Sequence, residues 1–115
     1  MASLELEEIL KPLIANPHVL GVLVANKEGS VIKTTLDAVI TKLYADKLTK
    51  YLEMTQKMIQ EIDEPDAPQK NELTFLRIRS KKHEIMISPD VTEHKYMLMV
   101  LQNPERKTES GKDRI

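Results

Sequence analysis

The sequence predicts one α/β domain with a single antiparallel sheet of about five strands, a long helix on one face and an N-terminal helix on the other. Its 115 residues fit one domain. A stretch of helical apolar spacing without glycine or proline runs from Thr41 to Ile62. Two short β-rich segments precede this stretch and three follow it. The expected order is therefore α-β-β-α-β-β-β over residues 1–104.

The first helix is predicted from one apolar face near the N-terminus. Its residues recur at the spacing of a single helical side: Leu6, Ile9, Leu10, Leu13 and Ile14. We expect this face to cover one side of the sheet. Pro12 interrupts the pattern, because a proline inside a helix removes a hydrogen bond and costs about 3 kcal/mol. A kink at Pro12 or an early end of the helix is therefore expected.

A β-hairpin is predicted next. Val19–Ala25 (VLGVLVA) is a continuous β-rich run, which is typical of a strand buried on both faces. Gly21 within it indicates a bulge or a close backbone approach. Asn26–Gly29 (NKEG) is a turn signal, and Ser30–Thr35 reads as the second strand.

The long helix carries an apolar arc that is wider than one sheet-facing stripe requires. The arc comprises Tyr44, Leu48, Tyr51, Leu52, Met54 and Met58. Either the whole arc belongs to the core, or part of it packs on a second partner, for which flexible methionines are well suited. The pattern leaves both explanations open. Asp37 or Thr41 is expected to cap the start of this helix.

A three-stranded meander is predicted after the polar loop Asp63–Lys70. Leu73–Arg79 alternates between two faces, Glu84–Ser88 returns, and Tyr96–Gln102 is apolar on both faces and should be a central strand. The charged residues 105–115 show no periodicity and are predicted to form a disordered polar tail.

The turn of this meander concentrates positive charge. Arg77 and Arg79 lie at the end of its predicted first strand, and Lys81, Lys82 and His83 follow in the turn. They suit an edge strand that charge protects from aggregation, a nucleic-acid site, or a strand that pairs with its own copy. A net charge of −1 and only 3% aromatic residues weigh against nucleic acid. The first and third explanations stay open.

The chain offers little that resembles catalytic chemistry, so we expect no enzyme, no cofactor and no metal. It has no cysteine, and His18, His83 and His94 are far apart without a metal-ligand spacing. The adjacent acidic pairs are most simply solvated helix ends. The longest apolar runs are too short for a bilayer span, and the acidic N-terminus is unlike a targeting peptide, so a soluble intracellular protein is expected.

Three stretches closely resemble the roadblock-type dynein light chains. They are GVLVANKEGSVIKTTLD (Gly21–Asp37), NELTFLRIRSKKHEIMISPD (Asn71–Asp90) and YMLMVLQNP (Tyr96–Pro104). The resemblance covers nearly Leu4–Pro104, and its second stretch is the most specific. Pro12 and a longer loop at residues 64–70 depart from the family pattern.

The resemblance implies a non-catalytic light chain of a dynein motor. It would form a homodimer, or a heterodimer with a sister roadblock light chain, and would bind the dynein intermediate chain in the cytoplasm, on the cytoskeleton or in the ciliary axoneme. The resemblance implies neither a nucleic-acid partner nor a membrane partner. The implied dimer contacts are Tyr44, Leu48, Tyr51, Leu52 and Thr55 on the helix, and Thr74, Phe75, Leu76, Arg77 and Ile78 on the strand. Roadblock-like proteins also occur as partners of GTPases, so a scaffold or regulator of a small GTPase is the alternative.

Overall fold

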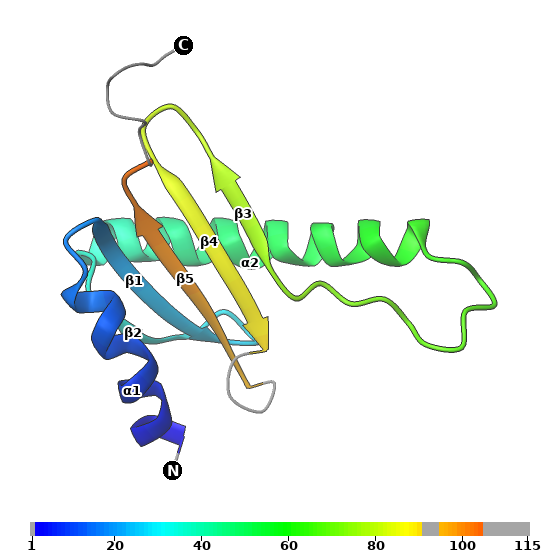
Figure 1. Ribbon diagram of the computed structural model, residues 1–115, viewed down its shortest axis with the longest axis horizontal. Coiled ribbons are helices and arrows are strands. Elements are labelled where there is room, and N and C mark those ends of the chain that lie inside the picture. The colour runs from blue at the N-terminus through cyan, green and yellow to red at the C-terminus, as the bar shows by residue number, and fades with distance from the viewer. Residues whose placement is uncertain (1, 91–94, 105–115) are drawn as a thin grey trace.

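The computed structural model describes residues 2–90 and 95–104, which form one antiparallel five-stranded sheet between two helices (Figure 1). The elements are α1 (Ala2–Ala15), β1 (Val19–Asn26), β2 (Val31–Thr34), α2 (Ala38–Ile62), β3 (Leu76–Arg79), β4 (Glu84–Asp90) and β5 (Tyr96–Gln102). The strand order across the sheet is β2-β1-β5-β4-β3. This confirms the predicted fold class and element order. The predicted tail at residues 105–115 lies outside the described residues.

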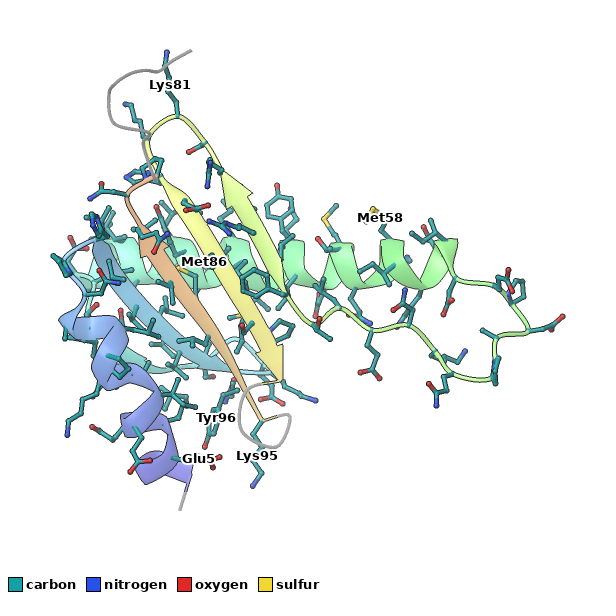
Figure 2. The ribbon with its side chains drawn as sticks, in the orientation of Figure 1. Glu5, Met58, Lys81, Met86, Lys95 and Tyr96 are labelled. Carbon is teal, nitrogen blue, oxygen red and sulfur yellow. The ribbon has the colours of Figure 1, made fainter. Side chains whose placement is uncertain are left out.

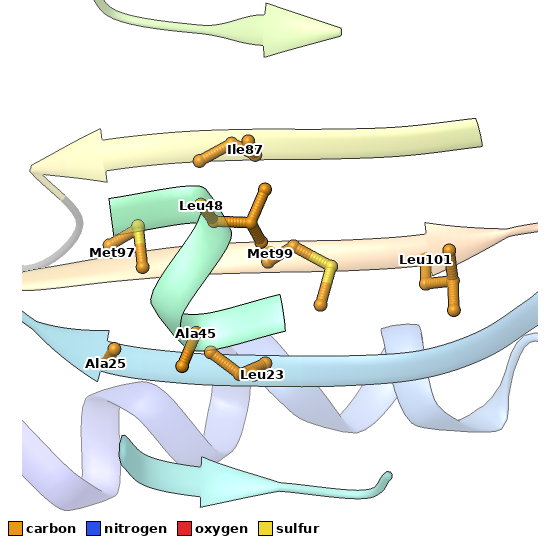
Figure 3. Close-up of a cluster of buried hydrophobic side chains, with 8 residues drawn as sticks. All are labelled: Leu23, Ala25, Ala45, Leu48, Ile87, Met97, Met99 and Leu101. Atoms are coloured by element: carbon orange, nitrogen blue, oxygen red, sulfur yellow. The ribbon is translucent and has the colours of Figure 1, made fainter. Parts of the chain in front are cut away.

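The larger core lies between the sheet and α2 (Figure 3). Alternate residues of β1 and β5 supply most of it, because neighbouring residues of a strand point to opposite faces. The core comprises Leu23, Ala25, Ala45, Leu48, Ile87, Met97, Met99 and Leu101. The central strand β5 is buried on both faces, as its uninterrupted apolar sequence predicts.

A second, smaller core lies under α1 on the opposite face of the sheet. Leu6 and Leu10 of α1 pack there against the remaining alternate residues of β1 and β5, which are Val22, Val24, Leu98 and Val100. The predicted role of the first helical face is therefore confirmed.

The expected early end of this helix at Pro12 is wrong, because α1 continues to Ala15. Pro12 lies in the last turn, and both Pro12 and Glu8 are exposed. The Glu8 carbonyl that loses its intrahelical donor therefore lies where water can satisfy it. Asn16 N donates to the Leu13 carbonyl at 3.2 Å and closes the helix.

The strand predicted over Leu73–Arg79 is wrong in its length, because β3 begins only at Leu76. Leu76 pairs with Ile87, so an extension of this register would place Thr74 opposite Pro89. Proline has no N–H to donate to a ladder. Leu73 instead is buried, and its N–H donates to the side-chain oxygen of Gln56 in α2 at 2.9 Å.

Candidate interaction surface

The C-terminal half of α2 exposes a stripe of large apolar side chains. Its members follow one another at intervals of three, four and four residues, so they lie on one side of the helix. They are Tyr51, Met54, Met58 and Ile62. Their exposed fractions lie between 47% and 73%, so the core does not account for them. Figure 2 shows Met58 on the part of α2 that extends past the sheet.

Other members of the predicted helix set belong to the core. Leu48 is buried, and Tyr44 and Leu52 are partly buried against the same cluster. Thr55 is half-buried, and its hydroxyl donates to the Tyr51 carbonyl at 2.8 Å. The wide apolar arc of α2 therefore divides into a core face and an exposed stripe.

The edge strand β3 adds to this exposed stripe. Among the described strands, β3 pairs only with β4, so its other side is open. Leu76 packs against the core between the sheet and α2, and Ile78 lies on that same face but is 41% exposed. Phe75, just before the strand, is also exposed. We call Tyr51, Met54, Met58, Ile62 and Ile78 together the α2–β3 surface.

The predicted strand set is divided between two faces of the sheet. Leu76 and Ile78 lie on the α2 side, whereas Arg77 lies on the other side and binds Glu84. Thr74 is exposed and precedes the strand. Of the implied dimer set, Tyr51 and Ile78 therefore belong to the α2–β3 surface. The side chain of Arg77 lies on the other face of the sheet, while its backbone belongs to the open edge strand. The helical pattern in the sequence extends to Ile62, but the implied dimer contacts do not include this residue.

A buried carboxylate organises the opposite face of β3 and β4. Glu84 has no exposed surface, and it lies in a row with Arg79 on β3 and Gln102 on β5. Its Oε2 accepts from Nε of Arg77 and, at 3.1 Å, from Nε of Arg79, and its Oε1 accepts from Gln102 at 2.9 Å. These four residues are the Glu84 cluster.

The Glu84 cluster keeps its carboxylate charged. Hydrogen bonds from Arg77 and Gln102, with a further one from Arg79, outweigh the effect of burial and lower the pKa of Glu84 from 4.5 to about 2. Glu84 was not among the predicted functional residues, because its role depends on the strand register. The sequence pattern that indicates this role is a glutamate directly after a turn, with two arginines in the strand before that turn.

Within residues 2–90 and 95–104, no group of three or more His, Cys, Asp or Glu side chains is placed to hold a metal ion. A cavity of about 680 Å³ lies between α2 and the sheet, and its walls include Leu52, Gln56, Leu73 and Met97.

Neither described helix carries an apolar stretch of the length and low charge that a bilayer span needs.

The described residues thus form a small α/β domain with an open sheet edge at β3 and an exposed apolar stripe on α2. The family model for the Roadblock/LC7 domain matches residues 5–103, so the chain belongs to the Roadblock/LC7 domain family.

Solved structures show the same fold at low sequence identity. A Roadblock/LC7 domain from Streptomyces avermitilis is 12% identical, with a TM-score of 0.64 over 79% of this chain and 71% of that one. MglB from Myxococcus xanthus is 13% identical, with a TM-score of 0.67 over 86% and 76%. An MglB structure with a tetrameric arrangement is 10% identical, with a TM-score of 0.64 over 84% and 68%.

Proposed function

We propose that this chain is a non-catalytic light chain of a dynein motor, which dimerises through the α2–β3 surface and holds a dynein intermediate chain. The stretch Asn71–Asp90 supports the class of partner, because it most specifically resembles the roadblock-type dynein light chains. The α2–β3 surface is the observation that carries dimerisation. It combines four apolar residues of one helix with an open strand edge.

A second copy satisfies both parts of this surface. Two β3 edges related by a two-fold axis would pair backbone to backbone, and the same rotation would bring two α2 stripes together. Burial of roughly 1,600 Å² at about 25 cal/mol per Å² supplies tens of kcal/mol before entropy and desolvation are subtracted. A domain of this size gains from such burial, because folding alone buries only a limited fraction of the surface that its unfolded chain exposes. A sister light chain with the same surface would form the heterodimer in the same way.

The partner is tested by affinity purification of the tagged chain from its source cells. We expect a dynein intermediate chain to be recovered with the wild type and to be reduced with Met58→Asp, which places a charge in the exposed stripe. Gln60→Asp is the matched control, since it adds the same charge to an exposed position of α2 outside the stripe. Recovery without an intermediate chain would contradict the proposal. The proposed locations are the cytoplasm, the cytoskeleton and the axoneme, and localisation of the tagged chain tests them.

A scaffold or regulator of a small GTPase is the second candidate. The similar solved structures described above support this candidate more than they support a motor subunit, because they are MglB and a bacterial roadblock domain. A nucleotide-hydrolysis assay with candidate GTPases separates the two functions. Stimulated hydrolysis, or recovery of a GTPase in place of an intermediate chain, would favour this candidate.

A further inference from the structure

The β3–β4 hairpin concentrates positive charge on a chain that is negative overall. From Leu76 to Asp90 there are four basic residues and two acidic residues, Glu84 and Asp90, which gives a net charge of +2. The whole chain carries −1, so the remaining residues carry −3. We call Arg77, Arg79, Lys81 and Lys82 the basic face. Lys81 lies at the tip of the hairpin (Figure 2).

Neither described helix covers the arginines of this basic face. Arg77 and Arg79 lie on the side of the sheet opposite α2, where α1 packs against β1 and β5. Figure 1 looks onto this side and shows β3 and β4 without a helix in front of them. The side chains of Arg77 and Arg79 are 48% and 53% exposed, and both lysines are exposed.

Glu84 makes the two arginines a fixed recognition element. Arg77 and Arg79 both donate to the same buried oxygen, Glu84 Oε2, so their guanidinium groups are held in place before a ligand arrives. Ordering flexible side chains on binding costs about 0.5–1.5 kcal/mol each, and this arrangement lowers that cost. A guanidinium has five N–H donors, more than one carboxylate oxygen accepts, so Arg79 retains donors for a further carboxylate.

We propose that the basic face binds an acidic peptide segment of a protein partner, through carboxylates that pair with the ordered arginines and the lysines of the turn. The charge complementarity is local, because the hairpin carries +2 within a negative chain. A peptide with a short acidic run contacts this face alone. A long nucleic acid would also meet the negative remainder of the molecule.

The positions of the aromatic residues also favour a peptide over a single-stranded nucleic acid, which requires stacking platforms beside the basic groups. Tyr44 and Tyr51 belong to α2, on the other side of the sheet. Tyr96 lies at the far end of β5 from the hairpin tip (Figure 2). Phe75 is exposed two residues before Arg77, so the base of the hairpin offers one stacking platform, whereas a run of bases needs several.

The inference does not require a dimer, but it gains from one. If β3 pairs with its copy, which rests on the proposed function, two basic faces adjoin on one side of a continuous sheet. The two hairpins would then present +4 to one partner segment. Glu84 in each copy also offsets part of the repulsion between arginines that meet near the two-fold axis.

Fluorescence anisotropy with a short labelled peptide carrying glutamate at alternate positions tests this inference. The full chain is expected to bind this peptide at low salt, to bind less as salt rises, and not to bind the same peptide with glutamine for glutamate. The double variant Lys81→Gln/Lys82→Gln should weaken binding about threefold to thirtyfold, from about 0.3–1 kcal/mol per exposed pair. Lys70→Gln in the exposed loop before β3 should change nothing.

A second pair of variants tests the arginines. Arg79→Lys keeps the charge and Arg79→Gln removes it, so peptide binding should fall more for the glutamine variant. Because both variants alter the contact with the buried Glu84, binding is compared at a temperature at which circular dichroism shows both of them folded. The inference would be overturned if the chain did not bind the peptide at low salt, or if Lys70→Gln lost as much affinity as the double lysine variant. Tighter binding of an oligonucleotide or of anionic vesicles than of the peptide would also overturn it. Sedimentation of the same samples separates the two proposals. A monomer that binds the peptide would contradict only the proposed dimer. A dimer that fails to bind the peptide would contradict only the proposed role of the basic face.

Discussion

Glu84 is a buried carboxylate whose hydrogen bonds to two arginines and a glutamine connect three strands. Burial alone disfavours its charged form, so the hydrogen bonds must more than compensate. A carboxylate held in this way links folding to pH. It also aligns β5, β4 and β3 in one register, because Gln102, Glu84 and Arg79 lie directly opposite one another.

Glu84 should make the stability of the domain fall in acid. Its pKa is lowered to about 2 in the folded chain, against 4.5 ordinarily. The unfolded chain therefore binds the proton first, and the stabilisation is full above about pH 4.5 and lost progressively as the pH falls towards 2. Urea unfolding of the wild type and Glu84→Gln measures this. The variant should be less stable at neutral pH, and the difference should shrink in acid; a difference independent of pH would contradict the account.

Gly21 should be intolerant of any side chain. A Cβ at this position would lie 2.2 Å from Cδ2 of Leu36 and 2.8 Å from its Cγ. Overpacking of this kind costs about 1–3 kcal/mol, so Gly21→Ala should lower the free energy of unfolding by that amount in urea. The sequence prediction of a close approach or a bulge is confirmed, because the register also shifts between Val19 and Gly21.

A double-mutant cycle supplies the control for Gly21. If Leu36 causes the strain, Gly21→Ala should be less damaging in a Leu36→Ala background, so that the two effects do not add. Additive effects would show that the strain arises elsewhere. The identity of Leu36 as the neighbour was not predictable from sequence, because it depends on how the chain crosses β1 between β2 and α2.

Among the elements, the sequence predicted the long helix, the hairpin and the central strand well, because each has a strong periodicity or a turn signal. The boundaries that failed depend on contacts between elements. β3 is shortened because its extension would meet Pro89, and Leu73 is directed to Gln56 of α2. α1 passes through Pro12 because its last turn is exposed.

The start of α2 depends on a single cap. The carboxylate of Asp37 accepts from the N–H of Ile40 at 2.8 Å, and the helix begins at Ala38. Of the two caps expected from the sequence, Asp37 and Thr41, the first is therefore confirmed. Loss of such a cap costs about 1 kcal/mol. Asp37→Ala should reduce the free energy of unfolding by about that amount, whereas Asp37→Asn should retain most of it. Equal losses in the two variants would argue against a capping role.

At the scale of the whole molecule, the two proposals concern opposite faces of β3. The α2–β3 surface is apolar and includes a sheet edge, and the basic face lies on the other side of the same strand. The sequence predicted surplus apolar width on the helix, and the family resemblance placed Arg77 and Ile78 in one contact. Strand alternation directs the side chains of these neighbours to different faces, so the two proposed contacts use different sides of the sheet.

Sedimentation velocity of the full chain at micromolar concentration tests the central claim most directly. The account predicts a dimer for the wild type, a shift towards monomer for Met58→Asp, and a dimer for the charge-matched Gln60→Asp, with all three chains folded by circular dichroism. A wild-type monomer, or identical behaviour of the two variants, would contradict dimerisation through the α2–β3 surface.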